Sequence, residues 1–237
     1  MDVSGRGIEI LHEDDQLIAL VKPAGLPTAN AAPGEESVYT SLQRRFGTGS
    51  FVGIVSRLDA PVSGVVVVAK TPAAAARLAA QFRDRTVVKS YAAIVTGRFP
   101  APLNAWVEWR DAVSRHPGEL RSVLHPAADG SDARGDAAPR PALTAARVVR
   151  RAGEVSLVEL VPATGRRHQL RLQLASRGCP IVGDRLYGSR LPFRPGGLAL
   201  HATKVTVAHP ATGREMAFES PVGALWTAAF PSLFSGG

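Results

Sequence analysis

Cysteine, aromatic residues and long apolar runs are all scarce in this chain of 237 residues. The single cysteine, Cys179, excludes an internal disulfide and a zinc site built from cysteines, and it is typical of a reducing compartment. No uninterrupted apolar run exceeds five residues, whereas a membrane-spanning helix needs about 20. The first residues also lack the basic and apolar segments of a secretory signal. We therefore expect a cytoplasmic protein without membrane contact.

Acidic residues are too few to balance the basic ones. There are 28 Lys and Arg against 20 Asp and Glu, which gives a net charge of +8 and a pI near 10.5. This excess indicates a polyanionic partner such as a nucleic acid, although a basic surface that binds no polyanion is the alternative. Arginines cluster at 83–85, 147–151 and 166–171. We expect them to form a structured basic face.

Several common catalytic and metal-binding patterns are missing. The six histidines show no ligand spacing such as H-E-x-x-H, so the sequence predicts no metal site. Ser63 is not part of a G-x-S-x-G elbow, and the glycines at 47–53 lack the spacing of a phosphate loop. The sequence indicates none of these chemistries.

Hydrophobic patterns and capping residues predict a mixture of strands and helices. Strands are expected at 8–11, 17–21, 51–57, 64–70, 86–95, 106–109, 143–149, 155–160, 198–208 and 216–219, and helices at 37–46 and 71–82. Ser37 and Thr71 are the expected N-caps, and Gly47 ends the first helix. The run from Val65 to Val68 is apolar on both faces, which predicts a central strand. Residues 111–141 are expected to be an exposed loop or insertion, because Gly, Pro, Asp and Arg dominate there.

The segment 164–171 is the densest polar cluster of the sequence. Leu170, Leu172 and Leu174 alternate as in a strand, but Thr164 as cap and Gly178 as stop favour a helix, and we predict a helix. Its first backbone N–H groups, beside Arg166 and Arg167, would be suited to bind phosphate. A solvated basic helix face is the alternative.

Asp59 is the most unusual carboxylate, because it lies between an apolar strand and the valine run. Burying a carboxylate without partners costs several kcal/mol, so cations should lie near it. Arg57 and the distant Arg171 are candidates. The alternative is a turn residue before Pro61 that bonds to its own backbone.

The sequence around Asp59 resembles a known family. Residues 56–64 (SRLDAPVSG) look like the H-R-L-D-x-x-T-S-G signature of the RluA-like pseudouridine synthases, within the RluA/RsuA superfamily. Further blocks of that family follow in its order at 12–15, 21–27, 89–91, 163–171, 183–188, 198–202 and 209–210. The ordered set is highly specific and covers nearly the whole chain. Ser56 and Val62 replace the His and Thr of the signature, so we expect hydrogen bonds near Asp59 to be lost or rearranged.

The resemblance implies a fold. It is an α+β catalytic domain with a long, bent, mixed but mostly antiparallel sheet, flanking helices and a central cleft. The motifs begin close to residue 1. We therefore expect residues 1–237 to form a single domain, with no S4-type RNA-binding domain in front.

The resemblance also implies an activity. It is the isomerisation of a specific uridine in rRNA or tRNA to pseudouridine: the base leaves C1′, turns and rejoins through C5 after it is flipped out of the RNA. RNA is the implied partner and no cofactor or metal is implied; we expect a monomer. The alternative is a catalytically weak or inactive homologue that binds or remodels RNA.

Residue roles follow by the same resemblance. Asp59 matches the essential carboxylate, acting as nucleophile or as the base of a glycal path. Tyr91 matches the ring that packs on the target base, and Arg171 matches the arginine that pairs with the carboxylate. Substrate binding is implied for Arg57, Arg166, Arg167, His168, Gln169 and Leu200.

Overall fold

The chain folds into two compact units of mixed strands and helices. The computed structural model describes residues 7–32, 34–47, 49–115, 121–126 and 138–235. One unit comprises residues 1–89 and 201–221, and the other comprises residues 90–200 and 222–237. Strands and helices occur in both units, which confirms the predicted α+β class. No helix of the described part is long and apolar enough to cross a membrane.

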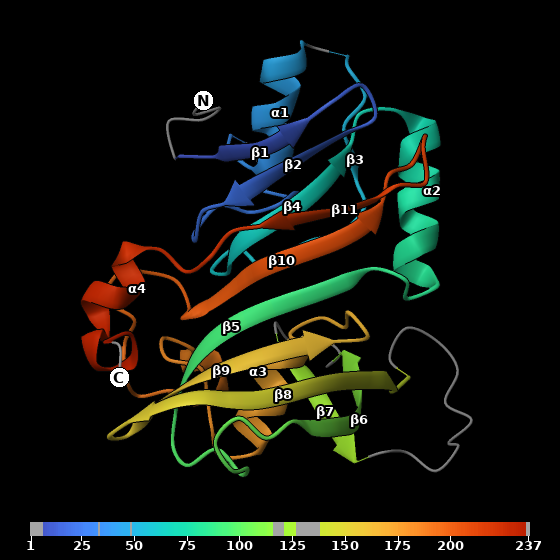
Figure 1. Ribbon diagram of the computed structural model, residues 1–237. Helices are drawn as coiled ribbons and strands as arrows, with labels where there is room; N and C mark the ends of the chain where they lie inside the picture. The colour runs from blue at the N-terminus through green and yellow to red at the C-terminus, as the bar shows by residue number, and fades with distance from the viewer. Residues whose placement is uncertain (1–6, 33, 48, 116–120, 127–137, 236–237) are drawn as a thin grey trace. The chain divides into compact units, whose positions relative to one another are not determined.

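The first unit is built on a sheet whose strands hydrogen-bond in the order β1-β2-β4-β10, with β3 paired to β4 and β11 paired to β10 (Figure 1). Its elements are β1 (Glu9–Glu13), β2 (Leu17–Lys22), α1 (Val38–Phe46), β3 (Gly53–Ile54), β4 (Ser63–Ala69), α2 (Pro72–Arg83), β10 (Leu200–Ala208) and β11 (Glu215–Glu219). Within this unit β4 and β10 pair in parallel and the other strand pairs are antiparallel.

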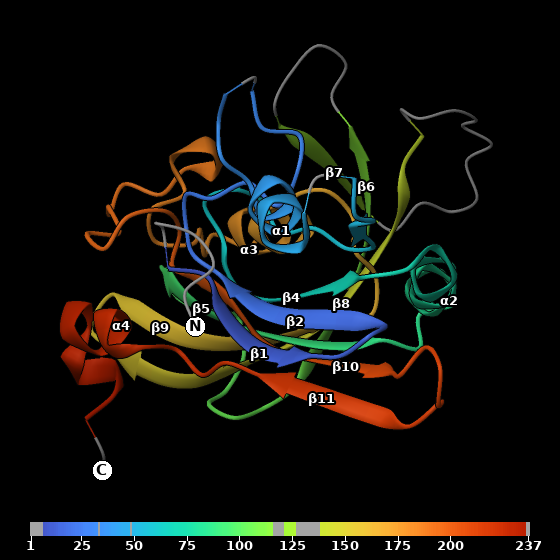
Figure 2. The same ribbon diagram turned by 90° about the horizontal axis from the view of Figure 1, so that it is seen from above.

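The valine run forms the buried centre of this sheet, as the sequence predicts. Val66 and Val68 belong to a core cluster with Val38 and Leu42 of α1, which Figure 2 shows end-on beside β2 and β4. Val65 and Val67 belong to a second cluster, with the apolar side of α2. Successive side chains of a strand point to opposite faces, so a strand with apolar groups on both faces needs cover on both.

The two helices of this unit begin where their caps predict. The Ser37 hydroxyl accepts the backbone N–H of Thr40, whose hydroxyl in turn accepts the backbone N–H of Ser37. The Thr71 hydroxyl accepts the N–H of Ala74, and Pro72 occupies the first helical position of α2. Such side-chain caps satisfy N–H groups that no helical carbonyl can reach.

The second unit carries antiparallel strands in the order β5-β9-β8-β6-β7 (Figure 1). Its elements are β5 (Val88–Thr96, entering from the first unit), β6 (Val107–Arg115), β7 (Ser122–Pro126), β8 (Arg140–Ala152), β9 (Val155–Pro162), α3 (Gln169–Ser176), α4 (Ala224–Ala229) and the 3-10 turns η1 (Arg185–Tyr187) and η2 (Pro231–Leu233). The predicted hairpin of 143–149 and 155–160 is confirmed. Leu172 of α3 packs on Val113 and Ala142 of the sheet.

The expectation of a loop over 111–141 is wrong where the structure describes it. Strand β6 continues to Arg115, β7 pairs with it, and β8 begins at Arg140. Polar residues mislead here because one face of β6 is solvated, as in many antiparallel sheets. The remaining residues, 116–120 and 127–137, lie outside the described part. The strand predicted at 51–57 is also shorter, because β3 comprises only Gly53 and Ile54.

Candidate active site

Asp59 lies in a tight turn that leads into β4. The backbone N–H of Val62 donates to the Asp59 carbonyl at 3.0 Å, and β4 starts one residue later. The Asp59 side chain is half-buried, whereas Arg57 is exposed. Val62, at the signature's Thr position, is buried and contributes its backbone to the turn. The prediction that Asp59 sits between two strands is confirmed.

Lys22 is a fully buried cation beside this turn. Its Nζ donates to the carbonyls of Pro23 (3.0 Å), Leu26 (2.7 Å) and Ala60 (3.0 Å), and its exposed fraction is 0%. Three carbonyls match the three N–H groups of an ammonium. Burial lowers the pKa of Lys22 to about 7, while the nearby charge of Asp59 acts in the opposite direction. Lys22 therefore gives the Asp59 turn both a hydrogen bond and a neighbouring cation.

The other end of the turn is held by a buried histidine. The Ser63 hydroxyl lies 2.8 Å from His201 Nδ1, and His201 Nε2 lies 3.0 Å from the Ser220 carbonyl. A carbonyl only accepts, so Nε2 carries the proton and Nδ1 of the neutral ring accepts from Ser63. Burial lowers the pKa of His201, which favours this neutral form.

Gly64 allows β10 to approach the same segment. Its φ is +119°, and a Cβ there would lie 2.3 Å from the carbonyl oxygen of Ala202. An L side chain fits neither the backbone conformation nor the space. The backbone conformation and the close approach of β10 therefore explain why a glycine stands at this position of the signature.

In the second unit, Arg171 of α3 forms a buried ion pair with Asp184. Arg171 Nε and Nη2 donate to the two carboxylate oxygens at 2.7 and 2.9 Å. The two side chains are only 7% and 1% exposed. A bidentate pair of this kind fixes the plane of the guanidinium. Arg171 and Asp59 belong to different units, and the pairing between them stays a prediction.

Tyr187 joins this pair to the predicted substrate-binding residue His168. The Arg171 guanidinium lies over the Tyr187 ring, 5.1 Å from its centroid. The Tyr187 hydroxyl lies 2.9 Å from His168 Nδ1 and accepts the backbone N–H of Ser122 at 2.9 Å. Burial raises the pKa of Tyr187, so the phenol keeps its proton and can donate it to His168.

The helix predicted from Thr164 exists but begins later. Helix α3 starts at Gln169, after His168 in a left-handed conformation with φ of 56°. Thr164 does not cap it, because its hydroxyl instead accepts the Leu143 N–H and donates to Gln169 Oε1. A left-handed residue just before the helix is not visible in apolar periodicity.

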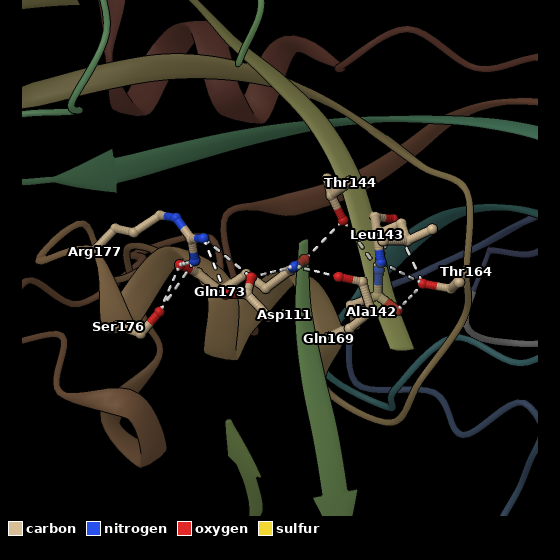
Figure 3. A network of polar contacts seen from close by, with 9 residues as sticks. All are labelled: Asp111, Ala142, Leu143, Thr144, Thr164, Gln169, Gln173, Ser176 and Arg177. Atoms are coloured by element: carbon tan, nitrogen blue, oxygen red, sulfur yellow. Dashed lines mark hydrogen bonds and ion pairs between the residues drawn. The ribbon is translucent and has the colours of Figure 1, made fainter. Parts of the chain in front are cut away.

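Gln169 belongs to a buried polar network that links α3 to β6 and β8 (Figure 3). The Gln169 side-chain amide donates to the Leu143 carbonyl and the Thr144 hydroxyl, and the residue is 4% exposed. Thr144 donates to Gln173, which donates to Asp111, which also pairs with Arg177. These contacts give Gln169 a structural position, and substrate binding by its side chain stays a prediction without support from them.

Of the remaining predicted site residues, Arg166 contacts this network through its backbone N–H, which donates to Gln169 Oε1 at 3.0 Å. Tyr91 is half-buried on β5, opposite Leu160 of β9, and Leu200 is buried at the start of β10. Arg167 is exposed, while the Arg166 guanidinium donates to the Pro141 carbonyl at 3.1 Å. Contact of these four side chains with substrate stays a prediction. Among the described residues, no group of three or more His, Cys, Asp or Glu is placed to hold a metal ion.

Comparison with known proteins identifies the family. A family described as RNA pseudouridylate synthase matches residues 16–176. The chain is 36% identical over 216 residues to the dual-specificity RNA pseudouridine synthase RluA of Escherichia coli (strain K12), covering 90% of this chain and 92% of that protein. The chain belongs to the RNA pseudouridylate synthase family. It is therefore an isomerase that forms pseudouridine in RNA, as the motifs around Asp59 indicated.

Other relatives agree with this assignment. Ribosomal large subunit pseudouridine synthase C of Vibrio vulnificus (strain CMCP6) is 31% identical over 225 residues, which are 90% of this chain and 65% of that protein. The solved structure of human RNA pseudouridylate synthase domain containing 4 is similar, with a TM-score of 0.75 at 26% identity, covering 95% of this chain and 93% of that one.

The sequence analysis did not identify three residues that support the candidate site. Lys22, Thr28 and Asp184 are buried polar residues. Their side chains form hydrogen bonds inside the protein, to the Leu26 carbonyl, the Leu58 carbonyl and the Arg171 guanidinium respectively. Lys22 and Asp184 lie inside the matched blocks 21–27 and 183–188, so the signal was present. Thr28 lies one residue beyond the first of these blocks.

Proposed function

We propose that this pseudouridine synthase modifies a specific uridine in rRNA or tRNA, with Asp59 as its essential carboxylate. The names of the relatives support the substrate class, because one is a dual-specificity RNA enzyme and another is a ribosomal large subunit enzyme. The geometry that carries the role of Asp59 is its turn, which Lys22 and Ser63–His201 hold from both sides. A carboxylate on a preorganised turn can be presented to a sugar carbon without reorganisation during the reaction.

The chemistry requires one bond to be exchanged for another. The N1–C1′ bond of uridine breaks, the base turns, a C1′–C5 bond forms, the hydrogen of C5 leaves as a proton, and N1 takes up a proton. Asp59 can attack C1′ as a nucleophile or remove a sugar proton in a glycal path, and both roles need the ionised carboxylate. Tyr91 would pack on the base, Arg171 would pair with Asp59, and the protein would act as a monomer.

The experiment follows the hydrogen of C5. Transcripts of the source organism's rRNA and tRNA labelled with tritium at uridine C5 release tritium when pseudouridine forms. We expect release with the wild-type protein and none with Asp59→Asn, because Asn keeps the size but not the nucleophilic or basic oxygen. RNA binding by Asp59→Asn should be retained or tighter, since a negative charge is removed.

The same experiment separates the enzyme from a protein that only binds RNA. If the wild-type protein releases no tritium from any transcript and Asp59→Asn binds RNA equally well, the role proposed for Asp59 is refuted. Release by Asp59→Asn at the wild-type rate refutes it as well.

A further inference from the structure

Leu58, the residue before Asp59, is held by a single side chain from a distant loop. Thr28 Oγ1 donates to the Leu58 carbonyl at 2.9 Å and accepts the Leu58 N–H at 3.2 Å. Thr28 and Leu58 are 30 residues apart in the chain and lie in the same unit. One hydroxyl thus satisfies both backbone groups of Leu58, the residue directly before the aspartate proposed to be catalytic.

Thr28 is itself held by backbone hydrogen bonds to the start of α1. Its carbonyl accepts the N–H of Tyr39 at 3.1 Å, and the Pro27 carbonyl accepts the N–H of Val38 at 2.9 Å. These two carbonyls satisfy N–H groups of the first turn of α1, which packs on the core through Val38. Thr28 is 2% exposed, so water has little access to replace its hydroxyl. The Thr28 hydroxyl is therefore held in place and can fix the position of the Leu58 peptide.

The Thr28 contact differs from the other contacts on the turn. Lys22 bonds only to carbonyls, and two of its three acceptors belong to its own loop. Ser63 and His201 act beyond the turn, at the start of β4. Thr28 acts on the peptide directly before Asp59, so a backbone rotation there moves the Asp59 carboxylate. A misplacement of 1 Å at a reacting group can reduce the rate about 100-fold.

We propose that Thr28 is a positioning residue for the reaction: its hydroxyl sets the Leu58 peptide and thereby the position of the Asp59 carboxylate. The proposal rests on the function proposed for Asp59. It makes Thr28 act through Leu58, without contact to the RNA.

The test compares three substitutions in the full-length protein. Thr28→Val keeps the volume and removes the hydroxyl, whereas Thr28→Ser keeps the hydroxyl. Thr71→Val is the matched control, because it removes one hydroxyl–backbone bond at the α2 cap, away from the Asp59 turn. Turnover and KM are measured by tritium release from C5-labelled transcripts, and folding is checked by thermal denaturation.

We expect a specific pattern of rates. Thr28→Val should lower kcat about 10- to 100-fold with KM and RNA affinity within about threefold of wild type, as expected for a misplaced reacting group. Thr28→Ser should stay within about threefold of wild type in kcat. Thr71→Val should be less stable than wild type with an unchanged kcat. If Thr28→Val does not fold, Thr28→Ala replaces it with the same expectation.

Three results would overturn the proposal: a wild-type kcat for Thr28→Val, a kcat for Thr28→Ser as low as that for Thr28→Val, or an equal loss of kcat in Thr71→Val. Asp59→Asn is assayed beside these variants. Active Asp59→Asn contradicts the function proposed for Asp59, whereas inactive Asp59→Asn with fully active Thr28→Val contradicts only the role of Thr28.

Discussion

The buried pair of Arg171 and Asp184 allows a quantitative test of the second unit. Asp184→Asn keeps the shape and one acceptor oxygen but removes the negative charge from a pair that is 7% and 1% exposed. Breaking a buried pair on one side costs about 3–5 kcal/mol, because the remaining charge stays buried. A chain of this size loses about 2–4 °C of melting temperature per kcal/mol, so we expect a decrease of about 6–20 °C.

The assay is thermal denaturation by circular dichroism at pH 7, with a control pair in the same unit. Arg147 and Glu159 lie 2.7 Å apart but are 34% and 32% exposed, so Glu159→Gln should cost at most about 1 kcal/mol. The double variant Arg171→Met with Asp184→Leu should regain part of the lost stability, because neither charge of the Arg171–Asp184 pair then remains buried. Equal melting temperatures for Asp184→Asn and Glu159→Gln would refute this reasoning.

Three further predictions concern packing, pH and salt. Gly64→Ala should destabilise the protein by more than about 3 kcal/mol, because its Cβ would collide with the backbone of Ala202. Gly188 has a φ of 93° but open space around it, so Gly188→Ala should cost only about 1 kcal/mol. Chemical denaturation measures the free energy of unfolding of both variants. Burial lowers the pKa of His201, so the unfolded chain binds a proton first as the pH falls below 6.5, and stability should decrease from there towards the folded pKa. His201→Gln should show a smaller difference in melting temperature between pH 7.5 and 5.5 than wild type does. RNA affinity should fall steeply with salt because the net charge is +8, and an equal dissociation constant at low and physiological salt would contradict this.

Local features of the fold were predictable because their causes lie within a few residues. The caps Ser37 and Thr71 and the stop Gly47 fixed the ends of two helices within one residue. The run Val65–Val68 gave the central strand, since burial on both faces leaves no polar position. The caps act on backbone groups within three residues of themselves, and the valine run can be recognised from its composition alone.

Contacts between distant segments were not predictable in the same way. Polar composition made residues 111–141 look like a loop, but in its described part residues 111–115, 122–126 and 140–141 pair as strands β6, β7 and β8. Thr164 looked like a helix cap, yet its hydroxyl bonds to Leu143, which is 21 residues earlier. Short polar side chains bind whichever backbone groups tertiary structure brings to them, and neither spacing nor propensity records this choice.

The same limit applies to the candidate site. Asp59 could be singled out because a carboxylate between apolar strands needs neighbours, but the sequence offered only arginines as candidates. The structure adds Lys22, which is the last residue of β2 and directly precedes Pro23. A buried lysine normally has hydrogen-bond or charged partners. The partners of Lys22 are backbone carbonyls, which every residue has. No residue type in the sequence could therefore have marked them.

The excess of basic residues lies mainly in the second unit. The first unit, which contains Asp59, has 12 Lys and Arg against 11 Asp and Glu, whereas the second has 16 against 9. Phosphate binding depends on the local excess of cations, so substitutions of exposed arginines in the second unit should act on RNA affinity. The Asp59 turn gains its order from uncharged contacts and one buried lysine. Substitutions there should act on turnover, because their contacts are made inside the protein and do not depend on a bound polyanion.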